Sequence, residues 1–165
     1  YDAAGAMGRG TCLRFTSKAV LASDAEFYGM RQFTPGPEKA GYVLFEGEEI
    51  PLGPQILVEA AGLEDLIVSA EICEDVWSPI PPSIGAALEG ATVIVNCSAS
   101  NETIGKDRYR RDLIAGQSAR VIASYVYANA GEGESTKDVV FGGHNIVADN
   151  CTVLVEPRRT RTERT

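Results

Sequence analysis

Five short runs rich in apolar and β-branched residues, separated by longer polar segments, most constrain how this chain can fold. The runs cover residues 66–73, 91–97, 121–128, 144–148 and 151–155, and we expect each to form a strand. The prolines of SPIPPSIGAALEG can start a helix that Gly90 ends, and KDRYRRDLIAGQSAR, residues 106–120, predicts a second helix. On that helix Tyr109, Leu113 and Gln117 fall four apart and predict its buried stripe. Alternating strands and helices indicate an α/β layered fold.

Turn-forming residues mark two tight connections. Asp149 and Asn150 separate the last two runs and both tolerate positive φ, which predicts a two-residue hairpin turn. Three glycines between residues 5 and 10 predict a turn that joins two strands near the start of the chain. We expect one domain over residues 1–156, followed by a polar, basic and solvated tail over 157–165.

Charge and cysteine placement argue against several classes of partner and site. The formal net charge of −8 would repel the phosphates of nucleic acid and of anionic membranes. No apolar run approaches the roughly 18 residues of a membrane-spanning helix. The four cysteines show no CxxC spacing, so we expect free thiols in the reducing cytoplasm, no metal site and no redox pair. The chain opens on Tyr1 without a signal peptide, so we expect its start to be a cut.

Cys73 is the strongest candidate for a reactive residue. It lies where a predicted strand stops and the turn-prone segment SPIPP follows, and such strand ends expose reactive groups in α/β sheets. Glu71, Glu74 and Asp75 flank it, and negative charge opposes the thiolate, so a reactive Cys73 needs a cation or a base. Period-two alternation would place Glu71 on the same face as Cys73. The alternative is a small buried hydrophobe, the common state of a free cysteine.

Polar residues after the next strand form a second candidate site. NCSASNETIGKDRYR, residues 96–110, is rich in short hydroxyl and amide side chains that suit a polar amide substrate. Alternatively it is a capping loop, with Asn101, Thr103 or Asp107 at the start of the helix. His144 could pair with a cysteine, although a structural histidine is the expected state. The segment AGEGEST lacks the ending of a phosphate-binding loop, and we do not expect it to bind a nucleotide.

Seven segments follow one another in an order typical of one enzyme family. They are EICEDVW, PPS, ALEGA, NCSASNETIGKDRYRR, QSAR, YANAGEGEST and FGGHN. Together they resemble the glutaminase domain of glutamine-dependent NAD synthetases, over about Glu26 to Val155. The resemblance implies a nitrilase-type α-β-β-α sandwich, here incomplete, with its first strands and its C-terminal part missing. It also implies hydrolysis of L-glutamine to supply ammonia for ATP-dependent NAD synthesis from nicotinic acid adenine dinucleotide.

The family uses a Cys-Glu-Lys catalytic set, and the resemblance carries two of these roles onto this chain. Cys73 of EICEDVW takes the place of the nucleophile. Lys18, eight residues before the glutamate that begins EFYGMRQF, takes the place of the lysine. That glutamate, Glu26, is similar to a second acid that orients the lysine in nitrilase-type enzymes. Around Lys18 the chain departs from the family, with Ser17 in place of a proline.

Substrate-binding roles follow from the same resemblance. It implies that glutamine is recognised partly by Ser100 of SASN and by Lys106. Lys18 and the backbone N–H of Glu74 would stabilise the oxyanion of the tetrahedral intermediate. We expect no cofactor in this chain, and ATP and Mg for the missing synthetase domain.

Two absences shape the prediction for the isolated chain. The family's general-base glutamate comes from a strand well before the lysine, and Asp2 is the sole acid ahead of Lys18 here. The synthetase domain, a further partner of the glutaminase domain in the family, is also missing. We therefore expect a fragment that is weak or inactive alone, from an enzyme that forms homo-oligomers at full length. Alternatives are another nitrilase-type amidase and a catalytically silent remnant.

Overall fold

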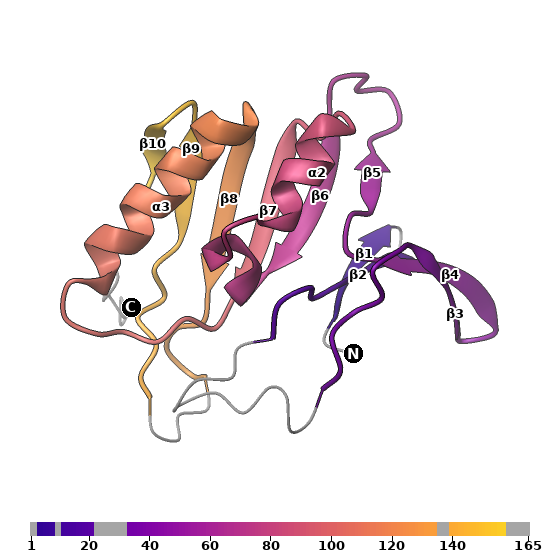
Figure 1. Ribbon diagram of the computed structural model, residues 1–165, viewed down its shortest axis with the longest axis horizontal. Coiled ribbons are helices and arrows are strands. Elements are labelled where there is room, and N and C mark those ends of the chain that lie inside the picture. Colours follow the sequence, from indigo (N-terminus) through magenta and orange to yellow (C-terminus); the bar gives the residue numbers. More distant parts are fainter. Residues whose placement is uncertain (1–2, 9–10, 22–32, 135–138, 158–165) are drawn as a thin grey trace, which may run out of the picture.

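Two β-sheets and two α-helices make up the described part of the chain in this computed structural model, residues 3–8, 11–21, 33–134 and 139–157 (Figure 1). The 4-stranded sheet has the order β1-β2-β4-β3 and the 6-stranded sheet the order β10-β9-β8-β7-β6-β5. The first sheet consists of β1 (Ala3–Gly8), β2 (Thr11–Ser17), β3 (Gly41–Phe45) and β4 (Glu48–Gly53). The second consists of β5 (Leu57–Glu59), β6 (Ile67–Ile72), β7 (Val93–Ser98), β8 (Ser124–Asn129), β9 (Ile146–Asp149) and β10 (Thr152–Val155).

Parallel pairing of β6, β7 and β8 sets the position of the candidate site. The crossovers between these strands contain α2 (Pro82–Leu88) and α3 (Lys106–Val121). Both helices cover the same face of the 6-stranded sheet (Figure 1). Because the strands are parallel, their carboxyl ends meet at one edge. Cys73, the loop after β7 and Asn129 therefore gather along that edge.

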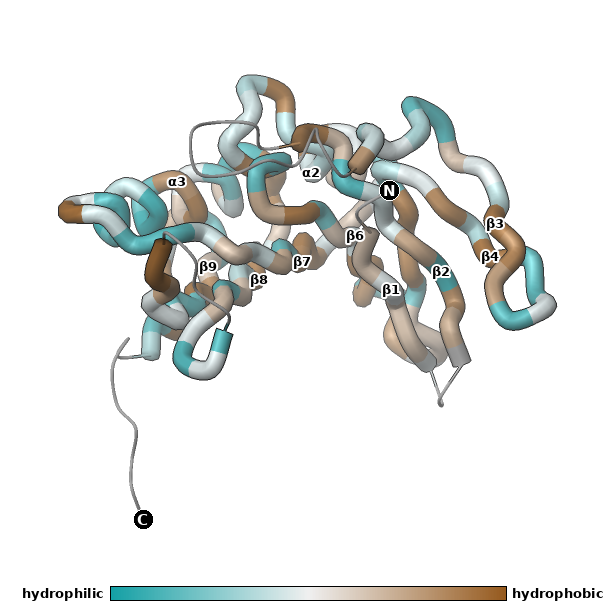
Figure 2. Tube along the Cα trace, turned by 90° about the horizontal axis from the view of Figure 1, so that it is seen from below, coloured by the Kyte–Doolittle hydropathy of each residue, from teal (hydrophilic) through white to brown (hydrophobic). Residues whose placement is uncertain are grey.

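The sandwich is formed where the two sheets meet. β1 and β2 contact β6, and the 4-stranded sheet lies beyond β6 on the side away from β9 (Figure 2). A small cavity between the sheets is lined by residues of both, including Thr16 and Cys97. Within the described ranges, no helix is both long and apolar enough to cross a membrane. The described layers are thus one of helices and two of strands.

Most elements predicted from the sequence are present. The five predicted strands correspond to β6 to β10, and both predicted helices form. β3, β4 and β5 were not predicted, because their residues mix apolar side chains with acids, proline and glycine. The hairpin turn lies one residue later than predicted, with Asn150 at φ 43° and Cys151 at φ 65°. Gly5 lies within β1 and not in a turn.

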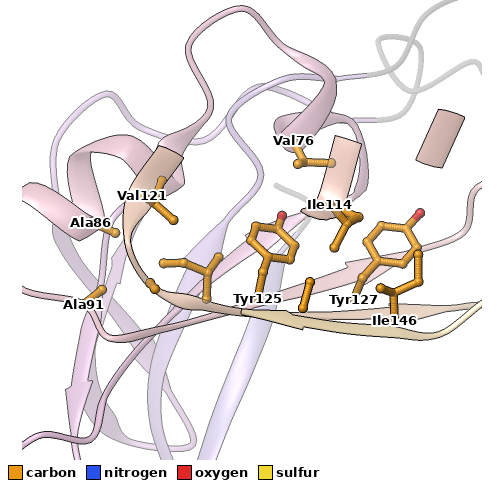
Figure 3. Packing of buried hydrophobic residues seen from close by; sticks show 11 residues of the cluster. Val76, Ala86, Ala91, Ile114, Val121, Tyr125, Tyr127 and Ile146 are labelled. Atoms are coloured by element: carbon orange, nitrogen blue, oxygen red, sulfur yellow. The ribbon is translucent and has the colours of Figure 1, made fainter. Parts of the chain in front are cut away.

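The hydrophobic core fills the space between the helices and the 6-stranded sheet (Figure 3). Its members are Val76, Ala86, Ala91, Ile94, Ile114, Val121, Ala123, Tyr125, Tyr127, Ile146 and Ala148. The stripe predicted for α3 is confirmed in part, because Gln117 is buried and Leu113 packs against the core, whereas Tyr109 is 61% exposed. The helix also buries Arg110, Ile114 and Ser118. Polar residues thus occupy much of its buried side.

Candidate active site

Cys73 begins a short 3₁₀ turn directly after β6. This turn, Cys73–Trp77, is called the nucleophile turn below. Cys73 has φ 50°, a left-handed conformation that few residues other than glycine adopt, and its free thiol is half-buried. Such outliers are held in place only by strong surroundings and are frequent at active sites. The alternation argument that placed Glu71 beside Cys73 is wrong, because the strand ends at Ile72 and Cys73 leaves the pleat.

Glu71 belongs to the structural core beneath the site. It is 1% exposed and accepts hydrogen bonds from the Ser83 backbone N–H at 2.9 Å and from the Tyr125 hydroxyl. Burial raises the pKa of Glu71 above 4.5, and the hydrogen bonds from Tyr125 and Ser83 lower it by less. Gln117 donates to the Ser83 hydroxyl at 3.0 Å and extends this network to α3. Both Glu71 oxygens are therefore committed to the fold.

Asp75 ties the segment after Lys18 to the nucleophile turn. One carboxylate oxygen accepts the backbone N–H groups of Ala19 at 3.0 Å and Val20 at 2.7 Å, and the other accepts the N–H of Ile72 at 2.9 Å. Burial raises the pKa of Asp75, whereas these hydrogen bonds and the Lys18 charge lower it by less. Lys18 is 8% exposed and directly follows β2. The carboxylate thus brings the neighbourhood of Lys18 to that of Cys73.

The loop between β7 and α3, residues 99–105 and called the polar loop below, presents Ser100 from the neighbouring strand. Asn129 at the end of β8 clamps the Ser100 backbone by accepting its N–H at 2.8 Å and donating to its carbonyl at 3.1 Å. Arg110 of α3 donates to the Ser100 hydroxyl at 3.3 Å and to the Asn101 carbonyl at 3.2 Å. Ser100 is 5% exposed and fixed from two sides.

Lys106 stands at the start of α3 beside the nucleophile turn. Its ammonium donates to the Asn101 side-chain oxygen and lies 5.6 Å from the ring centre of Trp77. Burial and the Arg110 charge lower the pKa of Lys106, and the charges of Cys73 and Glu74 oppose that change. Lys106 therefore borders the nucleophile turn through its contact with Trp77.

The capping interpretation of the polar loop is wrong. The residue that caps α3 is Gly105 at φ 80°, and no side chain bonds to the cap. Asn101, Thr103 and Asp107 do not cap the helix. The Asn101 side chain instead holds Lys106.

Arg110 and His144 form a buried pair behind the polar loop, and both are 0% exposed. The guanidinium lies 2.9 Å from His144 Nδ1 and 2.6 Å from a carboxylate oxygen of Glu102. His144 Nε2 lies 2.7 Å from Glu156, which also accepts from Arg111 at 2.9 Å. With both ring nitrogens engaged, His144 is a structural residue, as predicted.

Tyr127 projects from β8 toward α3 on the side of the sheet that carries the nucleophile turn (Figure 3). It is 1% exposed, and its hydroxyl has no hydrogen bond of good geometry among the described residues. Burial raises the pKa of Tyr127 and the charge of Cys73 raises it further, whereas the nearby Ser98 and Ser100 hydroxyls and the Arg110 charge lower it. Tyr127 is thus a buried phenol of the core on the side of the sheet that carries the nucleophile turn.

Of the residues predicted for the site, Cys73, Glu74, Ser100 and Lys106 lie along the carboxyl edge of β6 and β7, and Asp75 links Lys18 to them. Glu26 lies outside the described residues. Cys97 lies within β7, and its side chain is exposed. Sequence reasoning missed Asp75, Arg110 and Asn129 as structural supports of the site. No group of three or more His, Cys, Asp or Glu residues suited to a metal occurs in the described part of the chain.

Comparisons with known proteins give the site its context. No protein-family model matches the chain. The glutamine-dependent NAD(+) synthetase of Mycobacterium leprae is 43% identical over 159 residues, 96% of this chain and 23% of that protein. The crystal structure of a glutamine-dependent NAD(+) synthetase from Cytophaga hutchinsonii matches with a TM-score of 0.77 at 29% identity, over 91% of this chain and 23% of that one.

The chain is a homologue of glutamine-dependent NAD(+) synthetases. It spans about 23% of the length of the curated relatives it matches. A variant of the amidase from Nesterenkonia sp. AN1, an enzyme of the nitrilase superfamily, shares the fold with a TM-score of 0.65 at 19% identity, over 91% of this chain and 48% of that one. That variant carries the acetamide moiety of fluoroacetamide bound covalently to its active-site cysteine. The predicted nitrilase-type fold, present here in part, is confirmed.

Proposed function

We propose that this chain carries the thiol site of a glutamine amidohydrolase, with Cys73 as the nucleophile. The observation that carries the proposal is the left-handed conformation of Cys73 at the carboxyl end of β6, in a turn pinned by Asp75. The covalent adduct on the active-site cysteine of the Nesterenkonia amidase supports a thiol mechanism on this fold. The resemblance to NAD synthetases supports free glutamine as the substrate.

The proposed reaction proceeds through a thioester. A base removes the Cys73 thiol proton, and the sulfur attacks the carbon of the glutamine side-chain amide. The tetrahedral intermediate collapses, the carbon–nitrogen bond breaks, and ammonia leaves with the added proton. Water then attacks the thioester, which releases glutamate and restores the thiol. Lys18 and the Glu74 backbone N–H stabilise the oxyanion in both halves.

Recognition of glutamine is assigned to Ser100 and Lys106. A hydroxyl in the polar loop and a cation at the start of α3 suit the oxygens of an amino acid, and the Lys106 ammonium lies 5.6 Å from the ring centre of Trp77 in the nucleophile turn. Glu26 is proposed to orient the Lys18 ammonium, and it lies outside the described residues. The other nitrilase-type amidases remain the second candidate class. They are distinguished by substrate, because a simple aliphatic amide does not need the Ser100 and Lys106 contacts.

Thiol activation is the weak step of the proposed mechanism in this chain. The described residues ahead of Lys18 contain no Asp or Glu. Glu71 and Asp75 already accept hydrogen bonds from the fold, so neither is free to take the thiol proton. General-base assistance contributes about 10²–10⁴-fold to a rate. We therefore propose that the 165-residue chain turns over slowly by itself.

For the longer relatives, we propose that the ammonia is used in ATP- and Mg-dependent synthesis of NAD from nicotinic acid adenine dinucleotide. That step belongs to the part of those proteins that this chain does not match, and an ADP complex of a relative from Acinetobacter baumannii is in line with it. We further propose a cytoplasmic enzyme that forms homo-oligomers at full length.

Covalent labelling tests the proposed function without requiring turnover. The 165-residue chain is incubated with 6-diazo-5-oxo-L-norleucine, a glutamine analogue whose diazo carbon takes up a proton and then alkylates a thiol sulfur with loss of dinitrogen. We expect a saturable rate, modification of Cys73 by peptide mass, protection by glutamine and none by acetamide. Cys97, which is exposed and lines the cavity between the two sheets, is the internal control. Modification of Cys97 in preference to Cys73, or equal protection by acetamide, would contradict the assignment.

A further inference from the structure

We propose that Arg110 is a positioning residue for substrate recognition. It orients the Ser100 hydroxyl as a hydrogen-bond donor and, through Asn101, fixes Lys106, so that both groups face an acceptor oxygen of the bound substrate. This inference rests on the function proposed above and gives that function a residue that neither the sequence pattern nor the comparisons assign.

Arg110 holds its place through partners from several segments of the chain. A guanidinium that is 0% exposed needs acceptors for its N–H groups; Nη1 and Nη2 of Arg110 have two each, whereas Nε has none among the described residues. The acceptors of Arg110 are Glu102 at 2.6 Å, His144 Nδ1 at 2.9 Å, the Asn101 carbonyl at 3.2 Å and the Ser100 hydroxyl at 3.3 Å. Three of these belong to the polar loop. The guanidinium therefore acts as a template on which the loop is folded.

The donor character of Arg110 settles the roles of its neighbours. An arginine donates hydrogen bonds and accepts none. His144 Nδ1 must therefore be an acceptor, which leaves the ring neutral with its proton on Nε2, donated to Glu156. This contact engages Nη1, the same guanidinium nitrogen that donates to Glu102 of the polar loop.

The hydrogen bond from Arg110 also sets the direction of the Ser100 hydroxyl. Its oxygen accepts from Arg110, so its proton points away from the guanidinium. The Ser100 backbone N–H and carbonyl are both taken by Asn129, so the backbone cannot rotate to change this direction. Ser100 thereby presents its hydroxyl proton as a donor, which suits an oxygen of the substrate.

Asn101 transmits the effect of Arg110 to Lys106. Its carbonyl accepts from Arg110 and its side-chain oxygen accepts from Lys106. Asn101 is 5% exposed, so both contacts lie in the interior of the loop. A lysine at position 110 would keep the charge but lose the planar fork that reaches several acceptors at once. The geometry of the loop, and not the charge alone, is what Arg110 supplies.

The test compares two alkylating reagents on the 165-residue chain. The glutamine analogue 6-diazo-5-oxo-L-norleucine reports recognition through its half-saturating concentration, and iodoacetamide reports the thiol alone. For Arg110→Lys we expect the half-saturating concentration to rise about tenfold or more, since a hydrogen bond involving a charged group is lost. The iodoacetamide rate should change less than about twofold. Arg108→Lys, at an exposed position of the same helix, is the matched control and should match the wild type.

A double-mutant cycle separates positioning from general support of the fold. Ser100→Ala removes the hydroxyl that Arg110 orients, so the effect of Arg110→Lys should shrink at least about threefold in that background. Equal effects in both backgrounds would overturn the orientation of Ser100 by Arg110. His144→Asn leaves the guanidinium in place while changing one of its acceptors, and we expect a smaller rise. If Arg110→Lys does not fold, the rise measured for His144→Asn tests the positioning role of Arg110 in its place.

The outcomes also separate this inference from the proposed function. Saturable labelling of the wild type with unchanged saturation in Arg110→Lys would overturn the role of Arg110 and leave the function standing. A wild type without saturation would overturn the function and this inference with it. Equal losses with both reagents would show that Arg110 supports the thiol site as a whole, and would overturn its specific role in recognition.

Discussion

The nucleophile turn and the polar loop follow neighbouring parallel strands, yet groups of opposite charge hold them. Asp75 holds the turn by accepting backbone N–H groups from Ala19, Val20 and Ile72. Arg110 holds the loop by donating mainly to side chains, with one carbonyl among its acceptors. The turn should therefore tolerate changes of side chain around it, because any residue except proline offers the same N–H. The loop depends on which side chains surround the guanidinium.

The largest effect on the reaction rate is expected for Lys18, whose neighbouring backbone Asp75 holds at the nucleophile turn. Lys18→Met should lower the single-turnover rate of ammonia release from glutamine by about 10²–10³, the usual loss when one oxyanion donor is removed. The binding of the glutamine analogue should change little, because Lys18 is proposed to act on the transition state. Lys39→Met, at an exposed position, is the control. A loss of affinity for the glutamine analogue with an unchanged rate of ammonia release would contradict the oxyanion role of Lys18 and assign it to substrate binding.

The backbone clamp at Asp75 should have the largest effect on stability. Asp75→Asn replaces one accepting oxygen with a donor, so at least one buried N–H faces another donor. We expect the free energy of unfolding to fall by about 2–3 kcal/mol in urea titrations. Asp112→Asn, on the exposed face of α3, should stay within about 0.5 kcal/mol of the wild type. Equal effects at the two positions would show that the clamp contributes little.

Two carboxylates near these regions should respond to acid with opposite sign. Burial raises the pKa of Glu71 above 4.5 despite hydrogen bonds from Tyr125 and Ser83. The folded chain therefore takes up this proton first, and the contribution of Glu71 to stability improves as pH falls from neutral toward 4.5. The wild type should gain stability relative to Glu71→Gln over this range, as measured by urea midpoints.

Glu156 provides the opposite case. Partial burial raises its pKa, but hydrogen bonds from His144 and Arg111 lower it by more, to below 4.5. Its contribution is therefore present above 4.5 and is lost as pH falls through the folded-state pKa. The wild type should lose stability relative to Glu156→Gln in that acidic range. The same direction for both carboxylates would show that burial, and not pairing, governs the two sites.

The smallest expected effect concerns the arginine next to Arg110. The Arg111 side chain is 48% exposed and pairs with Glu156 at 2.9 Å. Exposed ion pairs contribute about 0–1 kcal/mol, so Arg111→Ala should lower the free energy of unfolding by less than about 0.5 kcal/mol. Arg110→Ala in the same assay should be far more harmful, since it leaves buried acceptors without donors. Similar losses in the free energy of unfolding for Arg110→Ala and Arg111→Ala would contradict the view that Arg110 organises the polar loop whereas Arg111 is a surface charge.

Local patterns in the sequence were sufficient to predict β6 to β10 of one sheet with their crossovers, but only the glycine-linked pair near the start of the chain in the other sheet. β7 to β9 place apolar residues in the core, whereas Tyr42 and Leu44 of β3 are exposed and β4 begins with two glutamates. The position of Cys73 could be predicted from a strand end. Its departure from the strand pleat could not, because φ 50° at a cysteine goes against the local preference and depends on tertiary contacts.

The supports of the site were missed for a related reason. Arg110 stands in a run of charged residues, RYRRD, that resembles a solvated helix face, and only the fold shows that one of its arginines is fully buried. Asp75 looked like an acid that opposes the thiolate, whereas its oxygens are occupied by N–H groups from a segment over 50 residues away. The sequence therefore identifies residues of this site but not the direction in which each side chain points.

The backbone conformation of Cys73 offers a way to tell whether natural selection still acts on the thiol. At φ 50° a glycine would be more stable than any residue with a β-carbon, by about 1 kcal/mol. A lineage that no longer used the site would gain stability by drifting to glycine there, and nothing in the folding of β6 would oppose the change. If close descendants of this gene retain cysteine at that position, selection for the reactivity of the thiol outweighs selection for stability there.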